Sequence, residues 1–318
     1  MSIPCYPDFT LLDINLKESM HPRLSLTSDG VSEFTFSSLY LFRKRYNYRI
    51  SLEPQPSPHT NGSYSSNFTS DKSNVRFIIS GTFGGKSFFM TPCGAPGEEI
   101  LNSLFTTHDF WKNISESVLA PVRERLQENG IIFEEDRNNF DYLYYRHDLS
   151  ELAGKKYHKK KNHVNHFLSA YPDHEQYPMS AAFVPAAMEI LEQWRCDSLL
   201  KNSGQDNDYN AAREALELFD SLSLKGSIFF VNNKPAAFCL GESIAKGRMF
   251  VIHFEKAVEE YKGIYQFMNQ EFASFLPGFY TFINREQDLG NEGLRQAKMT
   301  YRPCGYVKKY TGKYSAGL

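Results

Sequence analysis

Ionisable side chains gather near the end of the sequence, in the stretch "YTFINREQDLGNEGLRQAKM" from Tyr280 to Met299. The stretch begins as a strand-like run, and period-two alternation places Asn284, Glu286 and Asp288 on one face if the strand continues that far. A carboxylate at a strand end, partly removed from water, has a raised pKa and takes a proton from an attacking amine. We therefore expect these residues to serve proton transfer and substrate binding. The alternative for Asp288 is that it caps the helix that follows.

A second candidate lies in "VIHFEKA", where His253 and Glu255 are two residues apart on a predicted strand. Residues with that spacing share a face of a sheet, and a histidine beside a carboxylate is an acid–base unit. This pair is a candidate for proton transfer. The alternative is an ordinary hydrogen-bonded pair at a sheet edge.

The most basic stretch is "LAGKKYHKKKNHVNHF", in which lysines alternate with an aromatic residue and histidines. Such a surface suits a phosphate backbone, including a tRNA end, or the headgroups of an anionic lipid. The alternative is the solvated face of a helix. The histidines have neither cysteines nor carboxylates beside them, so we predict no metal site. The candidate lysines for phosphate or tRNA binding are Lys155, Lys156, Lys159 and Lys160.

Several well-known motifs are missing from the sequence, including the hydrolase GxSxG, the Walker loop and the dinucleotide fingerprint. The loop in "AVEEYKGIYQF" contains one glycine, Gly263, preceded by Glu259 and Glu260. A coenzyme A pyrophosphate needs backbone amides at a helix start, and two carboxylates repel it. We assign no resident cofactor. The donors that we consider are aminoacyl-tRNA and acyl-CoA.

The composition is that of a globular protein, with 318 residues, 41% hydrophobic and 23% charged. This length fits two compact domains. The formal net charge of −2 excludes a general polycation, so nucleic-acid binding requires a local basic patch. Five scattered cysteines without a CxxC pattern indicate a reduced, cytoplasmic setting. The opening residues do not form a signal peptide, and no apolar run is long enough to cross a membrane.

The predicted elements come in two similar series. In the first half, strand-like "YNYRISL" and "VRFIISGTF" precede a hairpin turn at Gly84–Gly85, a helix over "DFWKNISESVLAPVRERLQENG" and a strand in "IIFEED". In the second half, a hairpin with Asn232–Asn233 in its turn precedes a strand, a helix and the strand "GFYTFINRE". An acidic patch follows the last strand of each series, as "FEEDRNNF" and "FINREQDLG". We predict a degenerate repeat with domains at 1–168 and 169–318.

The stretch "GLRQAKMTYRPCGYVKKY" resembles the end of the catalytic domain of phosphatidylglycerol lysyltransferases. In that family, Gly-Leu-Arg, two further residues, Lys and an aromatic-x-Pro run close the second acetyltransferase-like unit. "GIYQFMNQEF" is similar to the family's helix after the fourth strand. The resemblance spans most of the chain, and "GKKYHKKKNHVNHF" and "NREQDLGNEGLRQAK" are more similar to a less characterised bacterial group classed with that domain. A more distant similarity links this chain to Fem-type peptidyl transferases, which use aminoacyl-tRNA.

The resemblance implies an α+β chain of two tandem GCN5-related N-acetyltransferase (GNAT)-like domains, each a mixed, mostly antiparallel sheet flanked by helices. It implies transfer of an activated acyl or aminoacyl group to an amine or hydroxyl. Arg295 and Lys298 match the family's Arg and Lys, and Tyr265 lies in the matching helix. The family has an Asp and an Arg where this chain has His253 and Lys256. The resemblance therefore does not extend to lysyl specificity or to phosphatidylglycerol as acceptor.

The sequence predicts an aminoacyl-tRNA-dependent acyl- or aminoacyltransferase whose active cleft lies in the second domain and whose acceptor is a lipid or a peptide. One alternative is an acyl-CoA-dependent N-acyltransferase. Another is a non-catalytic module that binds RNA or an anionic membrane. The predicted catalytic residues are His253, Glu255, Glu286 and Lys298. The predicted substrate-binding residues are Asn284, Asp288, Arg295, Lys256 and Tyr265.

Overall fold

The computed structural model describes residues 2–56, 64–65, 75–200 and 208–315. It contains two compact units, and each is described by itself. Unit 1 comprises Met1–Phe140 together with Val307–Leu318, and unit 2 comprises Asp141–Tyr306. In the described part of the chain, no helix has both the length and the apolar composition needed to cross a bilayer.

Unit 1 is built on a seven-stranded sheet with the order β1-β2-β5-β6-β7-β16-β8. All pairs for which a register is defined are antiparallel except β6–β7. The strands are β1 (Thr10–Leu11), β2 (Arg49–Leu52), β5 (Phe77–Phe83), β6 (Lys86–Met90), β7 (Phe110–Ser115), β8 (Ile131–Glu135) and β16 (Lys309–Tyr314), with a separate ribbon of β3 (Gln55–Pro56) and β4 (Tyr64–Ser65). The helices are α1 (Lys17–Leu24), α2 (Phe36–Leu41), α3 (Arg43–Tyr46), α4 (Glu98–Thr107), α5 (Glu116–Leu119) and α6 (Arg123–Glu128).

The core of unit 1 forms between α4 and the sheet. Leu101 and Leu104 of α4 pack with Phe89 and Trp111, whose rings stack with centroids 5.9 Å apart. The β5–β6 hairpin turns at Gly84–Gly85, where both residues have positive φ angles of 58° and 78°. Glycine adopts that conformation without steric cost, which confirms the predicted turn.

Unit 2 is built on a second seven-stranded sheet with the order β10-β11-β12-β13-β14-β9-β15. Its pairs of defined register are antiparallel except β13–β14. The strands are β9 (Asp141–Tyr145), β10 (His174–Pro178), β11 (Lys225–Val231), β12 (Lys234–Ile244), β13 (Met249–Ala257), β14 (Phe282–Asn284) and β15 (Gly305–Val307). The helices are α7 (Arg146–Glu151), α8 (His158–Ala170), α9 (Val184–Leu200), α10 (Tyr209–Glu217), α11 (Phe219–Leu222), α12 (Ile264–Phe275) and α13 (Glu292–Met299).

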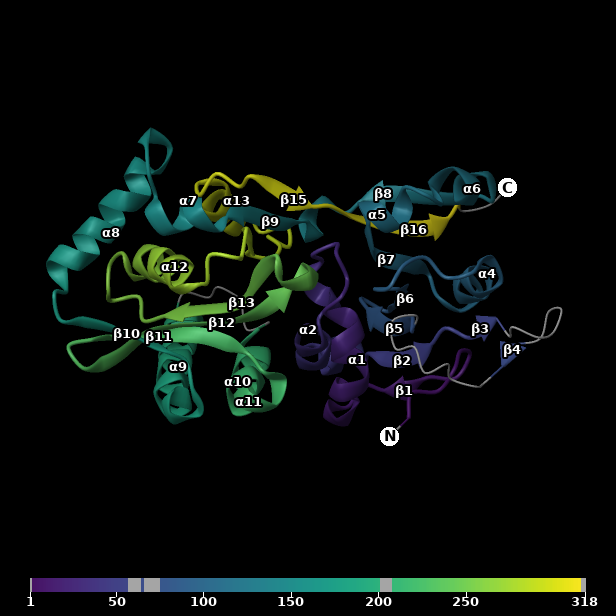
Figure 1. The fold of residues 1–318 in the computed structure, drawn as a ribbon, viewed down its shortest axis with the longest axis horizontal. Coiled ribbons are helices and arrows are strands. Elements are labelled where there is room, and N and C mark those ends of the chain that lie inside the picture. The colour runs from purple at the N-terminus through teal and green to yellow at the C-terminus, as the bar shows by residue number, and fades with distance from the viewer. Residues whose placement is uncertain (1, 57–63, 66–74, 201–207, 316–318) are drawn as a thin grey trace. The chain divides into compact units, whose positions relative to one another are not determined.

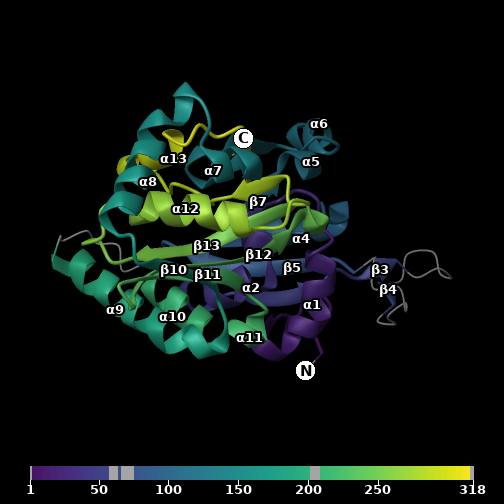
Figure 2. The same ribbon diagram turned by 60° about the vertical axis from the view of Figure 1, so that its left-hand side comes forward.

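Helices cover both faces of the unit 2 sheet. The helix α12 lies on one face, and α9 and α10 lie on the other (Figures 1 and 2). The α12 face has the larger apolar core, to which α12 contributes Phe267 and Phe272 and β13 contributes Phe250 and Ile252. The β11–β12 hairpin turns at Asn232–Asn233 with positive φ angles of 51° and 61°, as predicted.

The two units share one order of elements. In unit 1 a hairpin (β5–β6) leads through α4 to β7, which is parallel to β6. In unit 2 a hairpin (β12–β13) leads through α12 to β14, which is parallel to β13. The repeat and the predicted α+β architecture of mixed, mostly antiparallel sheets are therefore present.

The correspondence of strands between the two units differs from the prediction at one strand. We predicted one long helix over "DFWKNISESVLAPVRERLQENG", but Phe110–Ser115 is the strand β7, and only short helices follow it. The counterpart of β14 is therefore β7 and not β8. Four of the six residues in β7 are buried, and this burial against the sheet overrides the helical pattern.

The compact units also differ from the predicted domains 1–168 and 169–318. A boundary after residue 168 falls inside α8, whose Val164 and Phe167 are buried in the core of unit 2. In addition, β9 pairs with β14 in unit 2, while the last strand, β16, pairs with β7 and β8 in unit 1. Sequence patterns within a segment do not reveal which sheet a strand joins, and this is why the boundary was misplaced.

Candidate functional site

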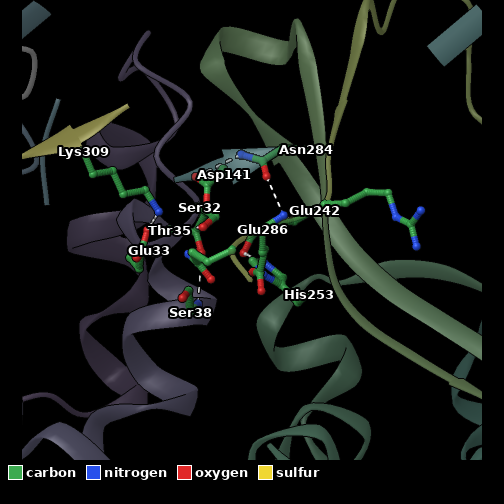
Figure 3. Close-up of polar contacts among 12 residues, drawn as sticks. Ser32, Glu33, Thr35, Ser38, Asp141, Glu242, His253, Asn284, Glu286 and Lys309 are labelled. Atoms are coloured by element: carbon green, nitrogen blue, oxygen red, sulfur yellow. Dashed lines mark hydrogen bonds and ion pairs between the residues drawn. The ribbon is translucent and has the colours of Figure 1, made fainter. Parts of the chain in front are cut away.

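A buried histidine lies between two carboxylates in unit 2 (Figure 3). His253 Nδ1 is 2.7 Å from Glu286 Oε1, and His253 Nε2 is 3.1 Å from Glu242 Oε1. The side chains of His253 and Glu242 are 3% and 5% exposed, whereas that of Glu286 is 22% exposed. Glu286 is therefore the member of this trio that a substrate can reach most directly.

A β-bulge positions His253. Leu240 of β12 pairs with Phe254 and Gly241 pairs with Ile252, so His253 has no partner in the register. A bulge turns a side chain away from its regular alternation, and bulges are frequent beside active sites. A Cβ on Gly241 would lie 1.9 Å from the carbonyl oxygen of Val251, so this close approach of strands requires glycine.

The position of Glu286 is set by Asn284 at the end of β14. The backbone N–H of Glu286 donates to Asn284 Oδ1 at 2.8 Å, and Asn284 Nδ2 donates to Asp141 Oδ2 at 3.2 Å (Figure 3). Glu286 itself has a φ of 53°, in the left-handed region that a glutamate rarely adopts. Asn284 and Asp141 are fully buried, so these bonds hold the strained turn from a rigid part of the sheet.

The protonation state of His253 depends on its two carboxylate partners. Burial by itself lowers the pKa of His253, but hydrogen bonds to Glu242 and Glu286 and their charges outweigh it and raise that pKa to about 10. At neutral pH His253 is an imidazolium that donates from both ring nitrogens. It cannot then act as the initial proton acceptor. The carboxylate of Glu286, oriented by this cation, is the group of the trio that can accept a proton from a substrate.

Glu255 is not part of this trio. We expected His253 and Glu255 to share a face, but the bulge breaks the alternation between them. Glu255 Oε2 instead accepts a hydrogen bond of 2.6 Å from Arg285 Nη2. The expected alternation beyond Asn284 is likewise interrupted, because β14 ends there and Glu286 takes a left-handed conformation.

Lys298 supports the backbone on both sides of Glu286. Its Nζ donates to the carbonyl oxygen of Arg285 at 2.6 Å and also to that of Gln287. Burial, together with the positive charge of Arg285, lowers the pKa of Lys298 to about 8. The family resemblance of "GLRQAK" singled out this lysine, and in the structure it contacts the same turn as Glu286.

Asp288 and Arg295 form a bidentate ion pair, with Arg295 Nε and Nη2 each 2.9 Å from a carboxylate oxygen. Asp288 is fully buried and also accepts from Tyr142 Oη at 2.6 Å and from the Gly290 N–H at 2.9 Å. It does not cap α13, since Asn291 does so by accepting from the Leu294 N–H. The pair anchors α13 to the sheet through Tyr142 of β9.

Lys256 and Tyr265 lie elsewhere in unit 2. Lys256 is buried, donates to Asp208 at 2.6 Å and stands 3.5 Å from the ring centroid of Trp194. Burial lowers its pKa, and the charge of Asp208 opposes that effect. Burial also raises the pKa of Tyr265 well above its usual range. Lys256 therefore pairs with a residue outside the trio of His253, Glu242 and Glu286.

The lysines of the basic stretch have different surroundings. Lys155 and Lys159 are exposed, and Lys156 donates to Asp148 at 2.7 Å. Lys160 is half-buried with its Nζ 4.1 Å from the ring centroid of Tyr301. Only part of the stretch is therefore a solvated helix face.

An open pocket of about 1060 Å³ lies beside α9 and the loop after β13. Its lining includes Glu259 and Glu260 from that loop, with Glu189, Glu192 and Asp197 from α9 and a lysine, Lys234. Five carboxylates against one lysine disfavour a pyrophosphate here, in line with the reading of the loop sequence.

Three residues of the site region were not predicted, namely Glu242, Asp141 and Arg285. Glu242 lies on β12, the strand just before β13, and Asp141 lies on β9, far from Asn284 in sequence, so the pairing of strands in the sheet brings them to His253 and Asn284. For Arg285 the sequence did hold a signal, because period-two alternation places it on the other face from Glu286 in "FINREQ". In the structure Arg285 donates a hydrogen bond to Glu255.

Known proteins resemble this chain over most of its length. A conserved protein of unknown function from Bacteroides thetaiotaomicron has 28% sequence identity and a TM-score of 0.81, with 96% of this chain and 99% of that chain covered. The C-terminal domain of a putative lysylphosphatidylglycerol synthetase from Agrobacterium fabrum has 15% identity and a TM-score of 0.51, covering 78% and 83%. The L-PGS of Bacillus licheniformis has 12% identity and a TM-score of 0.52, covering 76% and 82%. These last two likenesses concern the fold alone.

An uncharacterised protein of Mycoplasmoides gallisepticum is 23% identical over 183 residues, 57% of this chain. The match spans 58% of the length of that relative. The family model described as phosphatidylglycerol lysyltransferase, C-terminal, matches residues 25–312, which include the whole sheet of unit 2 and the trio of His253, Glu242 and Glu286. The chain belongs to this family.

Proposed function

We propose that this chain transfers an activated aminoacyl group from aminoacyl-tRNA to an amine or hydroxyl on a lipid or peptide. Family membership supports an acyltransferase-type activity. The observation that carries the proposal is the partly exposed carboxylate of Glu286, 2.7 Å from the buried His253. An ester-activated donor needs only a positioned and deprotonated nucleophile, so no covalent enzyme intermediate is required.

In the proposed step, Glu286 accepts the proton of the acceptor amine or hydroxyl as that nucleophile attacks the donor's ester carbonyl. A new amide or ester bond forms, and the bond from the carbonyl carbon to the ribose oxygen of the donor breaks. The proton held by Glu286 passes to that leaving oxygen, so the carboxylate is regenerated. His253 and Glu242 are positioning residues, because they hold Glu286 without reaching the surface themselves.

Lys298 is a positioning residue in this proposal, since its Nζ holds the carbonyl groups on either side of Glu286. Glu255 pairs with Arg285, and Arg295 with Asp288. These two ion pairs fix the turn between β14 and α13, from which Glu286 projects. Their proposed contribution is to keep the carboxylate in one place, which is a precondition for efficient proton transfer.

Acyl-CoA is the alternative donor. The carboxylates of Glu259 and Glu260 in the pocket after β13 argue against a pyrophosphate at that loop. The exposed Lys155 and Lys159 instead favour RNA contact, and they equally suit a non-catalytic module that binds RNA or an anionic membrane. The three functions make different predictions about donor and turnover.

A donor screen tests the proposal. Charged tRNA pools and a panel of acyl-CoAs, each with a labelled acyl group, are incubated with the protein and a cell extract, and the label is followed into lipid and peptide fractions. We expect transfer from tRNA, with Glu286→Gln reducing it by about 10²-fold or more. Glu292→Gln, an exposed carboxylate at the start of α13, is the matched control and should retain full turnover.

Equal turnover by Glu286→Gln and the control would exclude Glu286 as the proton acceptor. Label transfer from acyl-CoA alone would assign the alternative donor. If the protein binds tRNA or anionic vesicles but transfers label from no donor, the non-catalytic module is the correct assignment.

A further inference from the structure

Two cationic side chains in unit 2, Lys160 and Arg285, lie next to the ring of Tyr301. Lys160 Nζ of α8 is 4.1 Å from the ring centroid of Tyr301, and the guanidinium carbon of Arg285 is 4.9 Å from the same centroid. Tyr301 is only 5% exposed, and the Arg285 side chain is 11% exposed. These residues belong neither to the His253 trio nor to the pocket after β13.

The hydrogen bonds of Arg285 are incomplete. Its Nη2 donates to Glu255 Oε2, but Nε and Nη1 are buried without a hydrogen-bond acceptor, and Glu255 Oε1 is buried without a donor. A small rotation of Glu255 would bring Oε1 to Nε, since Nε and Nη2 share one edge of the guanidinium. Nη1 would still lack an acceptor, and a buried N–H without one is destabilising.

The charges around Tyr301 do not balance either. Glu255 is the one carboxylate paired with Arg285, and within the described ranges Lys160 forms no ion pair. Lys298 adds a third cation, because its Nζ binds the carbonyl oxygen of Arg285. Burial and the charge of Arg285 lower the pKa of Lys160 to about 8, because both disfavour the ammonium form.

We propose that Lys160 and Arg285 bind an oxyanion, a phosphate or carboxylate group, beside the ring of Tyr301. Such a group supplies the acceptors that Nη1 and the ammonium lack, and it supplies the missing negative charge. A guanidinium and an ammonium together are a common way to hold phosphate or carboxylate. The site goes beyond the proposed transfer reaction, since it requires neither an activated donor nor Glu286.

Anion titrations of the full-length protein at low ionic strength test the site. Inorganic phosphate and glycerol 3-phosphate are followed by ³¹P NMR line width, and ¹³C-labelled acetate is followed in parallel as the carboxylate. We expect at least one of these probes to bind, and Lys160→Gln to weaken that binding by about tenfold, the loss of one charged hydrogen bond. Lys262→Gln removes the same charge from an exposed lysine outside the basic stretch and should change the affinity by less than about twofold.

Arg285→Lys keeps the charge but removes Nη1, and we expect it also to weaken binding. If circular dichroism shows that this variant is unfolded, the pair of lysine variants decides, because Lys160 is only half-buried. Phosphate-selective binding assigns a phosphorylated ligand, and acetate binding assigns a carboxylate. The proposal is overturned if none of the three probes binds, or if Lys262→Gln and Lys160→Gln weaken binding equally. No acyl donor is present, so the result is independent of the transfer activity.

Discussion

His253 Nδ1 and Glu286 Oε1 are 2.7 Å apart although 33 residues separate them in sequence. The pairing is possible because β13 and β14 are parallel neighbours and α12 connects them. In their register Val251 of β13 pairs with Asn284 of β14, so His253, two residues further along β13, lies beside Glu286 just beyond β14. The geometry of this pair leads to predictions about stability and about the backbone that supports it.

The first prediction concerns the pH dependence of stability. The pKa of His253 is raised to about 10 by the hydrogen bonds and charges of Glu242 and Glu286, which outweigh its burial. Since the folded-state pKa lies above the unfolded value of about 6.5, the contribution of His253 is fully present below that pH and is lost as pH rises to about 10. We expect the free energy of unfolding of the wild type, measured in urea, to fall over this window more steeply than that of His253→Gln. Parallel curves for the two proteins would show that His253 is not held as a cation.

The second prediction concerns the backbone of Glu286. Asn284→Ala removes the acceptor of the Glu286 N–H and leaves buried Asp141 without one of its donors. We expect a loss of about 1–3 kcal/mol in the free energy of unfolding. We also expect lower transfer activity at unchanged substrate affinity, because Glu286 is released from its strained conformation while the substrate contacts remain. Full activity in a variant that is destabilised by this amount would mean that the turn keeps its shape without Asn284.

The third prediction concerns the β-bulge. A Cβ at Gly241 would lie 1.9 Å from the Val251 carbonyl oxygen, so Gly241→Ala must separate β12 from β13 beside His253. We expect destabilisation of about 3 kcal/mol or more, measured by thermal and urea unfolding. Gly278→Ala is the control, since nothing lies within 4 Å of its added Cβ. Similar stability for the two variants would contradict the tight approach of the strands.

The fourth prediction concerns the anchor of α13. Asp288 is fully buried and accepts hydrogen bonds from Arg295, Tyr142 and the Gly290 N–H. Asp288→Asn removes the charge that pairs with Arg295, and we expect a loss of about 3 kcal/mol in the free energy of unfolding. We expect Arg295→Gln to lose less, because Arg295 is 35% exposed and the remaining carboxylate keeps its other donors. Equal and small losses would assign Asp288 a minor role in stability.

Much of the fold was predictable from local patterns. The turns at Gly84–Gly85 and Asn232–Asn233 and the helix α12 followed from residue preferences and hydrophobic spacing, and the family resemblance implied the α+β class. The strand β7 and the pairing of β16 with unit 1 did not, because both depend on neighbours that are distant in sequence. A pattern within one segment cannot show which sheet a strand completes.

The residue types of the site were predictable from the sequence, but which side chains bond to one another was not. Asn284 and Glu286 were expected together at one strand end and His253 on another strand, and hydrogen bonds connect the three residues. Glu255 was expected beside His253, but a bulge has no reliable sequence signal and it changed the direction of the side chain. The partners Glu242 and Asp141 come from other strands, so only the order of strands in the sheet reveals them.

The place of β16 in the sheet of unit 1 has a consequence for synthesis on the ribosome. The strand between β7 and β8 in unit 1 is β16, which ends at Tyr314, so the sheet of unit 1 cannot be completed until translation has passed Tyr314. Until then β7 and β8 each have an open edge, and exposed edges attract other chains. A nascent chain released before that point would therefore be prone to aggregate, because the strand that completes unit 1 is translated after unit 2.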